Sequence, residues 1–249
     1  GAGTGKTTTL KVIVDAYKAM KYKIYPVALS GKAARRLQQS IDIETSTIAR
    51  LLNSKSNYSD RSMLLVDEAS MLDAYTMWRL VTQFPDSTRI LLVGDPYQLP
   101  PINAGFILSD VVKSGIIAHV ELDVVKRTGA TSSIPAFANS IRMGLVPEPL
   151  FTPEISFKEL TDDIISDAAD AYKYYSNAMI VAGTNKTVRK VNHKVQELVN
   201  PHGKVLDLSN MPIIHSNYEF RKGDSVVITL TCYKNDVQNG TLATIVDVE

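Results

Sequence analysis

The apolar positions in the first part of the chain form short continuous runs separated by stretches with helical spacing. Three runs have the length and apolar character of buried strands, at residues 22–30, 61–70 and 89–101. Amphipathic stretches of helical length accompany them, at residues 8–20, 31–40 and 73–84. Because strand and helix alternate, the pattern predicts an α/β fold built on a wound parallel sheet.

The pattern changes after the third predicted strand. Residues 106–143 are mostly helical, with a strand-like segment at 118–123. Residues 143–154 contain three prolines and one glycine, which is typical of a linker between domains. This composition predicts that a second structural unit begins near this point.

Beyond the predicted linker, residues 176–185 are typical of a strand that opens a second parallel sheet, and residues 186–200 of a helix. Two β-like runs follow at 222–230 and 240–248. They are joined through Asn239-Gly240, a dipeptide that favours a tight hairpin turn. The end of the sequence therefore predicts a small β-barrel or β-insert.

Composition narrows the class of protein only slightly. Among 249 residues, 27 Lys and Arg balance 26 Asp and Glu, so any nucleic-acid surface must be local. The single Cys232 cannot form an internal disulfide, and there is no signal-like or membrane-length apolar run. These features favour a protein of the reducing cytoplasm with no membrane partner.

The chain opens with the Gly-rich stretch GAGTGKTTT directly before a predicted helix. Gly5, Lys6 and Thr7 match the end of the phosphate-loop pattern G-x-x-x-x-G-K-[ST], whose first glycine would fall one place before Gly1. Glycines let backbone N–H groups approach phosphate oxygens, Lys6 is expected to reach the β and γ phosphates, and the Thr7 hydroxyl is expected to ligate Mg²⁺. The predicted ATP-binding residues are Gly3, Thr4, Gly5, Lys6, Thr7 and Thr8. The alternative is a purely structural helix cap.

Two carboxylates end the second apolar run, in LLVDEAS. Ligands of open α/β sheets bind at the carboxyl ends of the strands, which is where Asp67 and Glu68 are expected. We expect Asp67 to hold Mg²⁺ and Glu68 to act as general base on the attacking water. A solvated strand end is the alternative interpretation.

The third apolar run ends in GDPYQLPP, and Gln98 is suited to hydrogen-bond the γ phosphate or the lytic water. An ordinary β-turn is the alternative, since Gly-Asp-Pro is turn chemistry in any protein. Further along, the Arg127 guanidinium in VVKRTG is suited to the charge that develops on a transferring phosphoryl group. A solvated Lys-Arg helix end is equally compatible with the sequence around Arg127.

Taken in order, these stretches resemble the RecD-like branch of superfamily 1 DNA helicases. The resemblance runs through GAGTGKTT as Walker A, ALSGKAARRL as motif Ia, LLVDEAS as Walker B, GDPYQLPPINAG as motif III, VVKRTG as motif IV and VAGTNKTVRKVN. It covers nearly the whole chain. It implies a P-loop NTPase in which two RecA-like domains clamp ATP and hydrolysis moves the protein 5′ to 3′ along single-stranded DNA, with roles in recombination or repair.

The resemblance also implies domains and a DNA path. The implied parts are a RecA-like domain 1A over residues 1–147, the start of a second RecA-like domain over 148–204, and an SH3-like β-insert over 205–249. The implied catalytic residues are Lys6, Glu68, Gln98 and Arg127, and the implied DNA-binding residues are Ser30, Gly31, Lys32 and Thr47. Hydroxyls, backbone N–H groups and a lysine at a strand-to-helix junction are good phosphate contacts. The alternative interpretation is that the basic helix edge that includes Lys32 is ordinary solvent-exposed surface with no DNA contact.

Motifs V and VI of such helicases do not occur before Glu249. The sequence is therefore expected to be a piece of a longer helicase, with impaired ATP turnover on its own, and a nuclease or second helicase subunit is a possible partner. Two other functions stay open: a non-catalytic ATP- or DNA-binding module, and a P-loop kinase for small molecules. ATP turnover with and without single-stranded DNA separates them.

Overall fold

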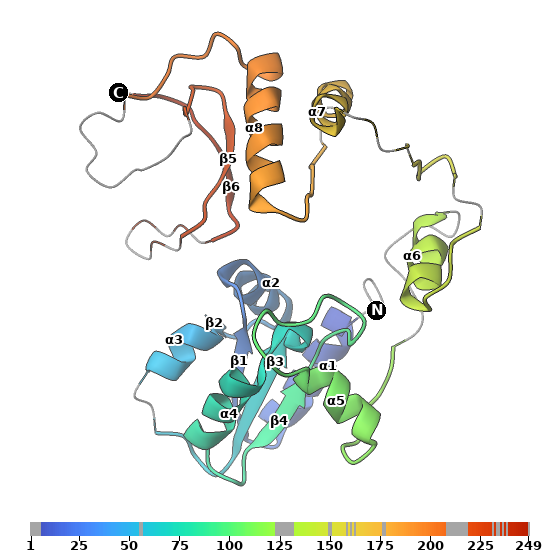
Figure 1. The fold of residues 1–249 in the computed structure, drawn as a ribbon. Coiled ribbons are helices and arrows are strands. Elements are labelled where there is room, and N and C mark those ends of the chain that lie inside the picture. Colours follow the sequence, from blue (N-terminus) through green and yellow to red (C-terminus); the bar gives the residue numbers. More distant parts are fainter. Residues whose placement is uncertain are drawn as a thin grey trace. The chain divides into compact units, whose positions relative to one another are not determined.

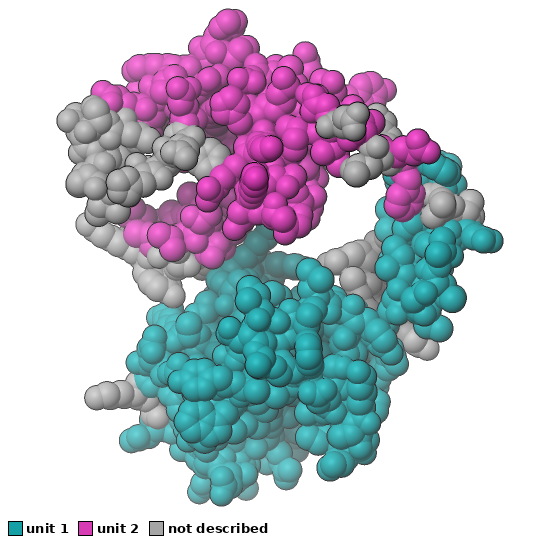
Figure 2. All heavy atoms as spheres, viewed as in Figure 1, with its two compact units in different colours: residues 1–156 teal, residues 157–249 magenta. Residues whose placement is uncertain are grey.

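The computed structural model divides the chain into two compact units, residues 1–156 and 157–249 (Figure 2). The residues whose structure is described are 6–54, 57–122, 132–148, 151–157, 159, 161, 163–175, 178–207, 219–230, 232, 235, 237 and 239–248. Each unit has its own arrangement of elements and is described by itself.

Unit 1 contains a four-stranded, fully parallel sheet of order β2-β1-β3-β4 (Figure 1). The strands are β1 (Lys23–Ala28), β2 (Ser46–Thr47), β3 (Ser62–Asp67) and β4 (Arg89–Leu92). Ala28 at the end of β1 is aligned with Thr47 on one side and with Asp67 on the other. The predicted α/β class and parallel sheet are confirmed.

One helix of unit 1 precedes the first strand, and the others follow strands. The helices are α1 (Lys6–Ala19), α2 (Gly31–Ile41), α3 (Ile48–Asn53), α4 (Ala74–Gln83), α5 (Ile107–Ser114) and α6 (Ile134–Arg142), with a short 3₁₀ turn η1 (Ala69–Met71) after β3. Figure 1 shows that α1 and α4 lie on opposite faces of the sheet. Both faces are therefore covered, as a parallel sheet requires.

The central strand β3 explains this layering. Its side chains alternate between the two faces, so Leu64 and Val66 enter one apolar cluster and Leu65 enters the other. The first cluster includes Leu80 of α4, and the second includes Val14 of α1. All five of these side chains are fully buried. A continuous apolar run was therefore the correct signature of a strand buried on both faces.

Helix α6 is held at its start by a residue distant in the sequence. Glu154 accepts hydrogen bonds from the Ser133 backbone N–H (2.7 Å), the Ser133 hydroxyl (2.8 Å) and the Ser132 hydroxyl (3.1 Å). A carboxylate at this position also interacts favourably with the helix dipole. Glu154 therefore holds Ser133, the N-cap residue of α6, in place.

Unit 2 consists of α7 (Ile164–Tyr174), α8 (Asn185–Val199) and an antiparallel pair formed by β5 (Ser225–Val227) and β6 (Leu242–Thr244). Asp224 ties the pair to α8 and the residue after its end, accepting hydrogen bonds from Gln196 and Asn200. The predicted antiparallel pairing is present, but the tight turn predicted at Asn239-Gly240 does not join the strands: β5 ends at Val227, β6 begins at Leu242, and the Gly240 N–H donates to the Ile228 carbonyl at 2.8 Å. The nature of the second unit and the domain boundaries 1–147, 148–204 and 205–249 stay predictions.

Two predicted strands differ from the structure. Residues 178–184 and 116–122 have no regular secondary structure. A strand needs a hydrogen-bonded neighbour, and among the described residues of unit 2 the sheet contains only β5 and β6, which pair with each other. The predicted second parallel sheet is therefore absent from the described part of the chain.

Candidate nucleotide site

The predicted motif residues meet at one edge of the sheet because the strands that carry them run in the same direction. Asp67 and Glu68 follow β3, and the loop with Gln98 follows β4. Hydrogen bonds continue beyond β4: the Val93 N–H donates to the Val66 carbonyl at 2.9 Å, and the Ala69 N–H donates to the Val93 carbonyl at 2.8 Å. These bonds join the two loops at their base.

The pKa of the Asp67 carboxylate is set by burial and by the charges around it, including that of Lys6. Burial raises the pKa of Asp67 above its ordinary value, and the neighbouring Glu68 carboxylate adds to the rise. A hydrogen bond from the Glu68 backbone N–H opposes the rise, as do the positive charges of Lys6 and Arg36. Lys6 is the first residue of α1, which packs on β3 through Val14 and Leu65, so its charge acts on the carboxylate at the end of β3.

Arg36 lies on helix α2, on the basic edge that also carries Lys32. Its positive charge is the smallest of the influences that lower the pKa of Asp67. Helix α2 begins three residues after β1, which pairs with β3 along its whole length. The only sequence signal for Arg36 was its place early in a helix that follows a strand adjacent to β3.

Glu68 has a strained backbone. Its φ of 54° and ψ of 39° lie in the left-handed region, which costs a residue with a Cβ about 1–2 kcal/mol. The neighbouring bonds hold it there: the Ala69 N–H is bonded to Val93, and the Met71 N–H donates to the Glu68 carbonyl at 3.2 Å. Strain of this kind collects at functional sites, where the surrounding structure maintains it.

The loop after β4 begins with a close backbone approach at Gly94. A Cβ on Gly94 would lie 2.6 Å from Leu108 Cδ2 and 2.9 Å from the Ser70 backbone nitrogen. Only glycine fits there, because backbone atoms cannot move aside cheaply. Gly94 therefore allows the loop after β4 to pack directly against η1.

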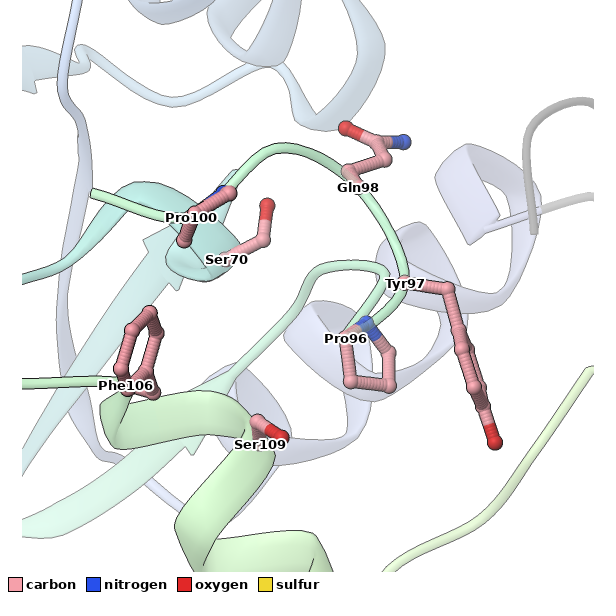
Figure 3. Close-up of a pocket in the computed structure, with 7 residues that line it drawn as sticks. All are labelled: Ser70, Pro96, Tyr97, Gln98, Pro100, Phe106 and Ser109. Atoms are coloured by element: carbon pink, nitrogen blue, oxygen red, sulfur yellow. The ribbon is translucent and has the colours of Figure 1, made fainter. Parts of the chain in front are cut away.

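Asp95 then organises the turn that carries Gln98. Its side chain accepts a hydrogen bond from the Tyr97 N–H (3.2 Å), and its carbonyl accepts one from the Gln98 N–H (3.0 Å). Asx turns of this type are a common use of aspartate. The Gln98 side chain is exposed and extends from the turn on the side away from Phe106 (Figure 3).

A pocket of about 190 Å³ lies between η1 and this loop. It is lined by Ser70, Pro96, Tyr97, Gln98, Pro100, Phe106 and Ser109 (Figure 3). Lys6, Asp67 and Glu68 do not line it. The pocket therefore does not include Lys6 or Asp67, the described residues that are predicted to bind the phosphates and Mg²⁺.

The predicted DNA-binding residues lie at neighbouring strand ends. Ser30 follows β1 and caps α2, accepting a hydrogen bond from the Ala33 N–H at 3.1 Å. Thr47 ends β2 and caps α3, accepting one from the Arg50 N–H at 3.2 Å. Gly31 is buried and Lys32 is exposed. Both hydroxyl oxygens act as helix caps and both lie on the carboxyl edge of the sheet.

Several predicted residues fall outside what the structure describes. Gly3, Thr4, Gly5 and Arg127 are not among the described residues, nor is the side chain of Thr7. Thr8 is exposed in the first turn of α1. Among the described residues, no three His, Cys, Asp or Glu side chains gather as metal ligands. No helix in the described parts of the chain combines the length and apolar character needed to cross a membrane.

A parallel α/β sheet with Lys6, Asp67 and Gln98 at its carboxyl edge defines the P-loop NTPase class. A family model described as "AAA domain" matches residues 1–152. With that match and the relatives below, the chain belongs to the AAA domain family and, within it, to the RecD-like superfamily 1 helicases.

Two curated relatives are similar over much of the chain. The "ATP-dependent RecD2 DNA helicase" of Deinococcus radiodurans is 29% identical over 269 aligned residues, which cover 100% of this chain and 36% of the relative. The "RecBCD enzyme subunit RecD" of Mycolicibacterium smegmatis is 34% identical over 179 residues, covering 58% of this chain and 32% of the relative. The chain thus spans about a third of the length of each of these relatives.

The Pif1 helicase from Candida albicans is similar in structure. The TM-score is 0.57 with 18% sequence identity, and the match covers 99% of this chain and 64% of the Pif1 chain. At this level of identity the likeness supports the RecA-like fold of the sheet and no more.

Proposed function

We propose that this chain is the nucleotide-hydrolysing part of a DNA helicase, which couples ATP hydrolysis to 5′-to-3′ movement on single-stranded DNA in recombination or repair. The observation that carries the proposal is the packing of α1 on β3 through Val14 and Leu65, with Lys6 at the start of the helix and its positive charge opposing the raised pKa of Asp67 at the end of the strand. An ammonium at the N-terminus of a helix, with a carboxylate at the end of the neighbouring strand, is what a triphosphate with its metal requires.

The nucleotide-binding role is assigned to the start of α1. The backbone N–H groups of Gly3, Thr4 and Gly5 would hold phosphate oxygens, together with the positive end of the helix dipole. Lys6 would reach the β and γ phosphates, and Thr8 would lie nearer the α phosphate. The exposure of Thr8 in the first turn is compatible with this role.

The chemistry of Asp67 fits a magnesium ion. A carboxylate whose pKa is raised by burial gains the most from a nearby cation, which restores its charged form. Magnesium is usually held by one or two protein groups and substrate phosphates, so Asp67 with the Thr7 hydroxyl is a sufficient set. When bound, the ion neutralises charge on the β and γ phosphates.

The hydrolytic step is assigned to three side chains. Glu68 would accept a proton from the attacking water, and its position next to Asp67 puts it at the same edge of the sheet. Gln98 would orient that water or bond the γ phosphate, and Arg127 would stabilise the charge of the transition state. The strained turn at Glu68 supports a role that depends on an accurately held side chain.

The DNA path is assigned to the ends of β1 and β2. Ser30, Gly31, Lys32 and Thr47 lie around two helix N-termini, which attract backbone phosphates. The relative named as a RecBCD subunit suggests a nuclease or second helicase subunit as partner. A cytoplasmic location belongs to the same proposal.

The proposal is tested by steady-state ATP hydrolysis of the full-length protein with and without single-stranded DNA. Stimulation by DNA, lost in Lys6→Ala with unchanged folding, is expected. Turnover that requires a small hydroxyl acceptor would indicate a kinase, and binding without turnover would indicate a non-catalytic module. Either result would contradict the helicase proposal.

A further inference from the structure

Arg142, the last residue of α6, contacts the turn that carries Gln98. Its guanidinium carbon lies 4.1 Å from the centre of the Tyr97 ring, a cation–π contact. One guanidinium nitrogen, Nη2, lies 4.0 Å from Asp95 Oδ1 and 2.9 Å from Glu121 Oε1. The side chain is only 24% exposed, although it stands at the end of a surface helix.

The two loop residues that Arg142 contacts are the ones that shape the turn. Asp95 is buried, and it accepts the backbone hydrogen bonds of Tyr97 and Gln98. The Tyr97 ring extends outward, away from Ser70 and Phe106, so it offers its face to α6 (Figure 3). A planar guanidinium satisfies both partners at once, since it stacks on a ring and pairs with carboxylates in its own plane.

Helix α6 is independently anchored. Glu154 caps its start through Ser132 and Ser133, at the opposite end from Arg142. Losing the Arg142 side chain would therefore leave the cap of the helix in place. Two of the three contacts of Arg142, with Asp95 and Tyr97, reach the loop after β4, and the shortest reaches Glu121.

We propose that Arg142 is a positioning residue that holds the turn from Asp95 to Gln98 in the geometry needed for hydrolysis. This inference rests on the proposed function, because it assigns Arg142 an effect only through Gln98. Arg142 also links α6 to the loop after β4, because it contacts Asp95, which lies 47 positions earlier in the sequence.

The test is a double-mutant cycle on DNA-stimulated ATP hydrolysis in the full-length protein. Arg142→Met keeps the length of the side chain and removes its charge and planar group. It is expected to lower kcat about 10-fold with KM for ATP changed less than about twofold. Arg142→Lys, which keeps the charge but not the stacking, should recover part of the loss.

The same substitution in a Gln98→Ala background distinguishes positioning from a general structural role. If Arg142 acts through Gln98, Arg142→Met has no further effect on kcat in that background. Two results would overturn the proposal. One is a double variant whose loss in kcat is the product of the two single losses, and the other is an unchanged kcat in Arg142→Met alone. If Arg142→Met lowers the melting temperature, the cycle is repeated with Arg142→Lys, and the same two outcomes decide.

Arg79→Met is the matched control. Arg79 makes the same kind of contact, 5.9 Å from the Tyr75 ring centre on α4, and should leave kcat unchanged. Unchanged turnover in Gln98→Ala alone would contradict the role proposed for Gln98 and, with it, the Arg142 inference. If kcat falls in Gln98→Ala but not in Arg142→Met, only the Arg142 inference is contradicted.

Discussion

The Asn103 side-chain amide donates a hydrogen bond of 2.9 Å to Asp73 Oδ2. The other oxygen, Asp73 Oδ1, accepts the Thr76 N–H at 2.7 Å and so caps α4. The Ala74 N–H adds a bond to the Ala104 carbonyl at 3.1 Å. The far end of the loop after β4 is thereby tied to the start of α4, while Asp95 lies at its near end.

These bonds predict an acid-sensitive contribution to stability. The Asn103 amide, then the Thr76 N–H, lower the pKa of Asp73 below its ordinary value of 3.8. A lowered folded-state pKa means that the stabilisation is complete above pH 3.8 and is lost as pH falls through the lower, folded value. Asp73→Ala should cost about 1–2 kcal/mol near neutral pH.

The measurement is the free energy of unfolding by denaturant between pH 7 and pH 3. The difference between the original protein and Asp73→Ala should shrink at the acid end. Asn103→Ala should lose part of the same stabilisation. A difference that grows on acidification would contradict the assignment of the bonds to the charged carboxylate.

The charged Asp67 carboxylate should affect the free energy of unfolding in the direction opposite to that of Asp73. Burial raises its pKa above 3.8, so the charged form destabilises the folded protein once pH exceeds the folded value. Asp67→Asn is therefore expected to increase the free energy of unfolding at pH 7 and to abolish ATP hydrolysis. The gain should vanish as pH falls through the raised pKa towards 3.8. Denaturant unfolding across this range measures it, and a loss of stability at pH 7 would refute the burial argument.

Glu68 allows the strain in its backbone to be measured separately from its chemistry. Glu68→Gly should be more stable than Glu68→Ala by about 1 kcal/mol, because glycine adopts the left-handed region without a Cβ clash. Both variants should lose ATP turnover. Asp42 has the same φ of 54° at the end of α2, away from the proposed chemistry. Asp42→Gly and Asp42→Ala are therefore the matched control variants. Equal stability of the glycine and alanine variants at Glu68 would show that the turn is unstrained.

Gly94 tests the packing of the loop against η1. Gly94→Ala would put a Cβ 2.6 Å from Leu108 Cδ2 and 2.9 Å from the Ser70 nitrogen. The expected loss is about 1–3 kcal/mol of stability, because the backbone must shift. Gly183→Ala is the control, since its Cβ would meet nothing within 4 Å. Thermal unfolding compares the two, and an equal change in melting temperature would contradict the close approach at Gly94.

The elements of unit 1 were predictable because their signals are local. The run from Met63 to Val66 is apolar at every position, which only a strand covered on both faces accommodates. The same logic failed for residues 178–184, since the described residues of unit 2 provide no strand beside this apolar run. The residues proposed for the site were found from motifs, although Gly3, Thr4, Gly5 and Arg127 lie outside the described residues.

The order of residues alone determined the strand–helix alternation and the place of Asp67 and Glu68 at a strand end, since both follow from periodicity and from the parallel direction of the strands. Only the tertiary structure decided which distant side chains meet: Asn103 on Asp73 and Arg142 on Tyr97. Such contacts carry no local signal, because an exposed arginine or asparagine has the same sequence pattern whether it faces water or a neighbouring loop. Their partners are set by how the helices and loops pack on the sheet.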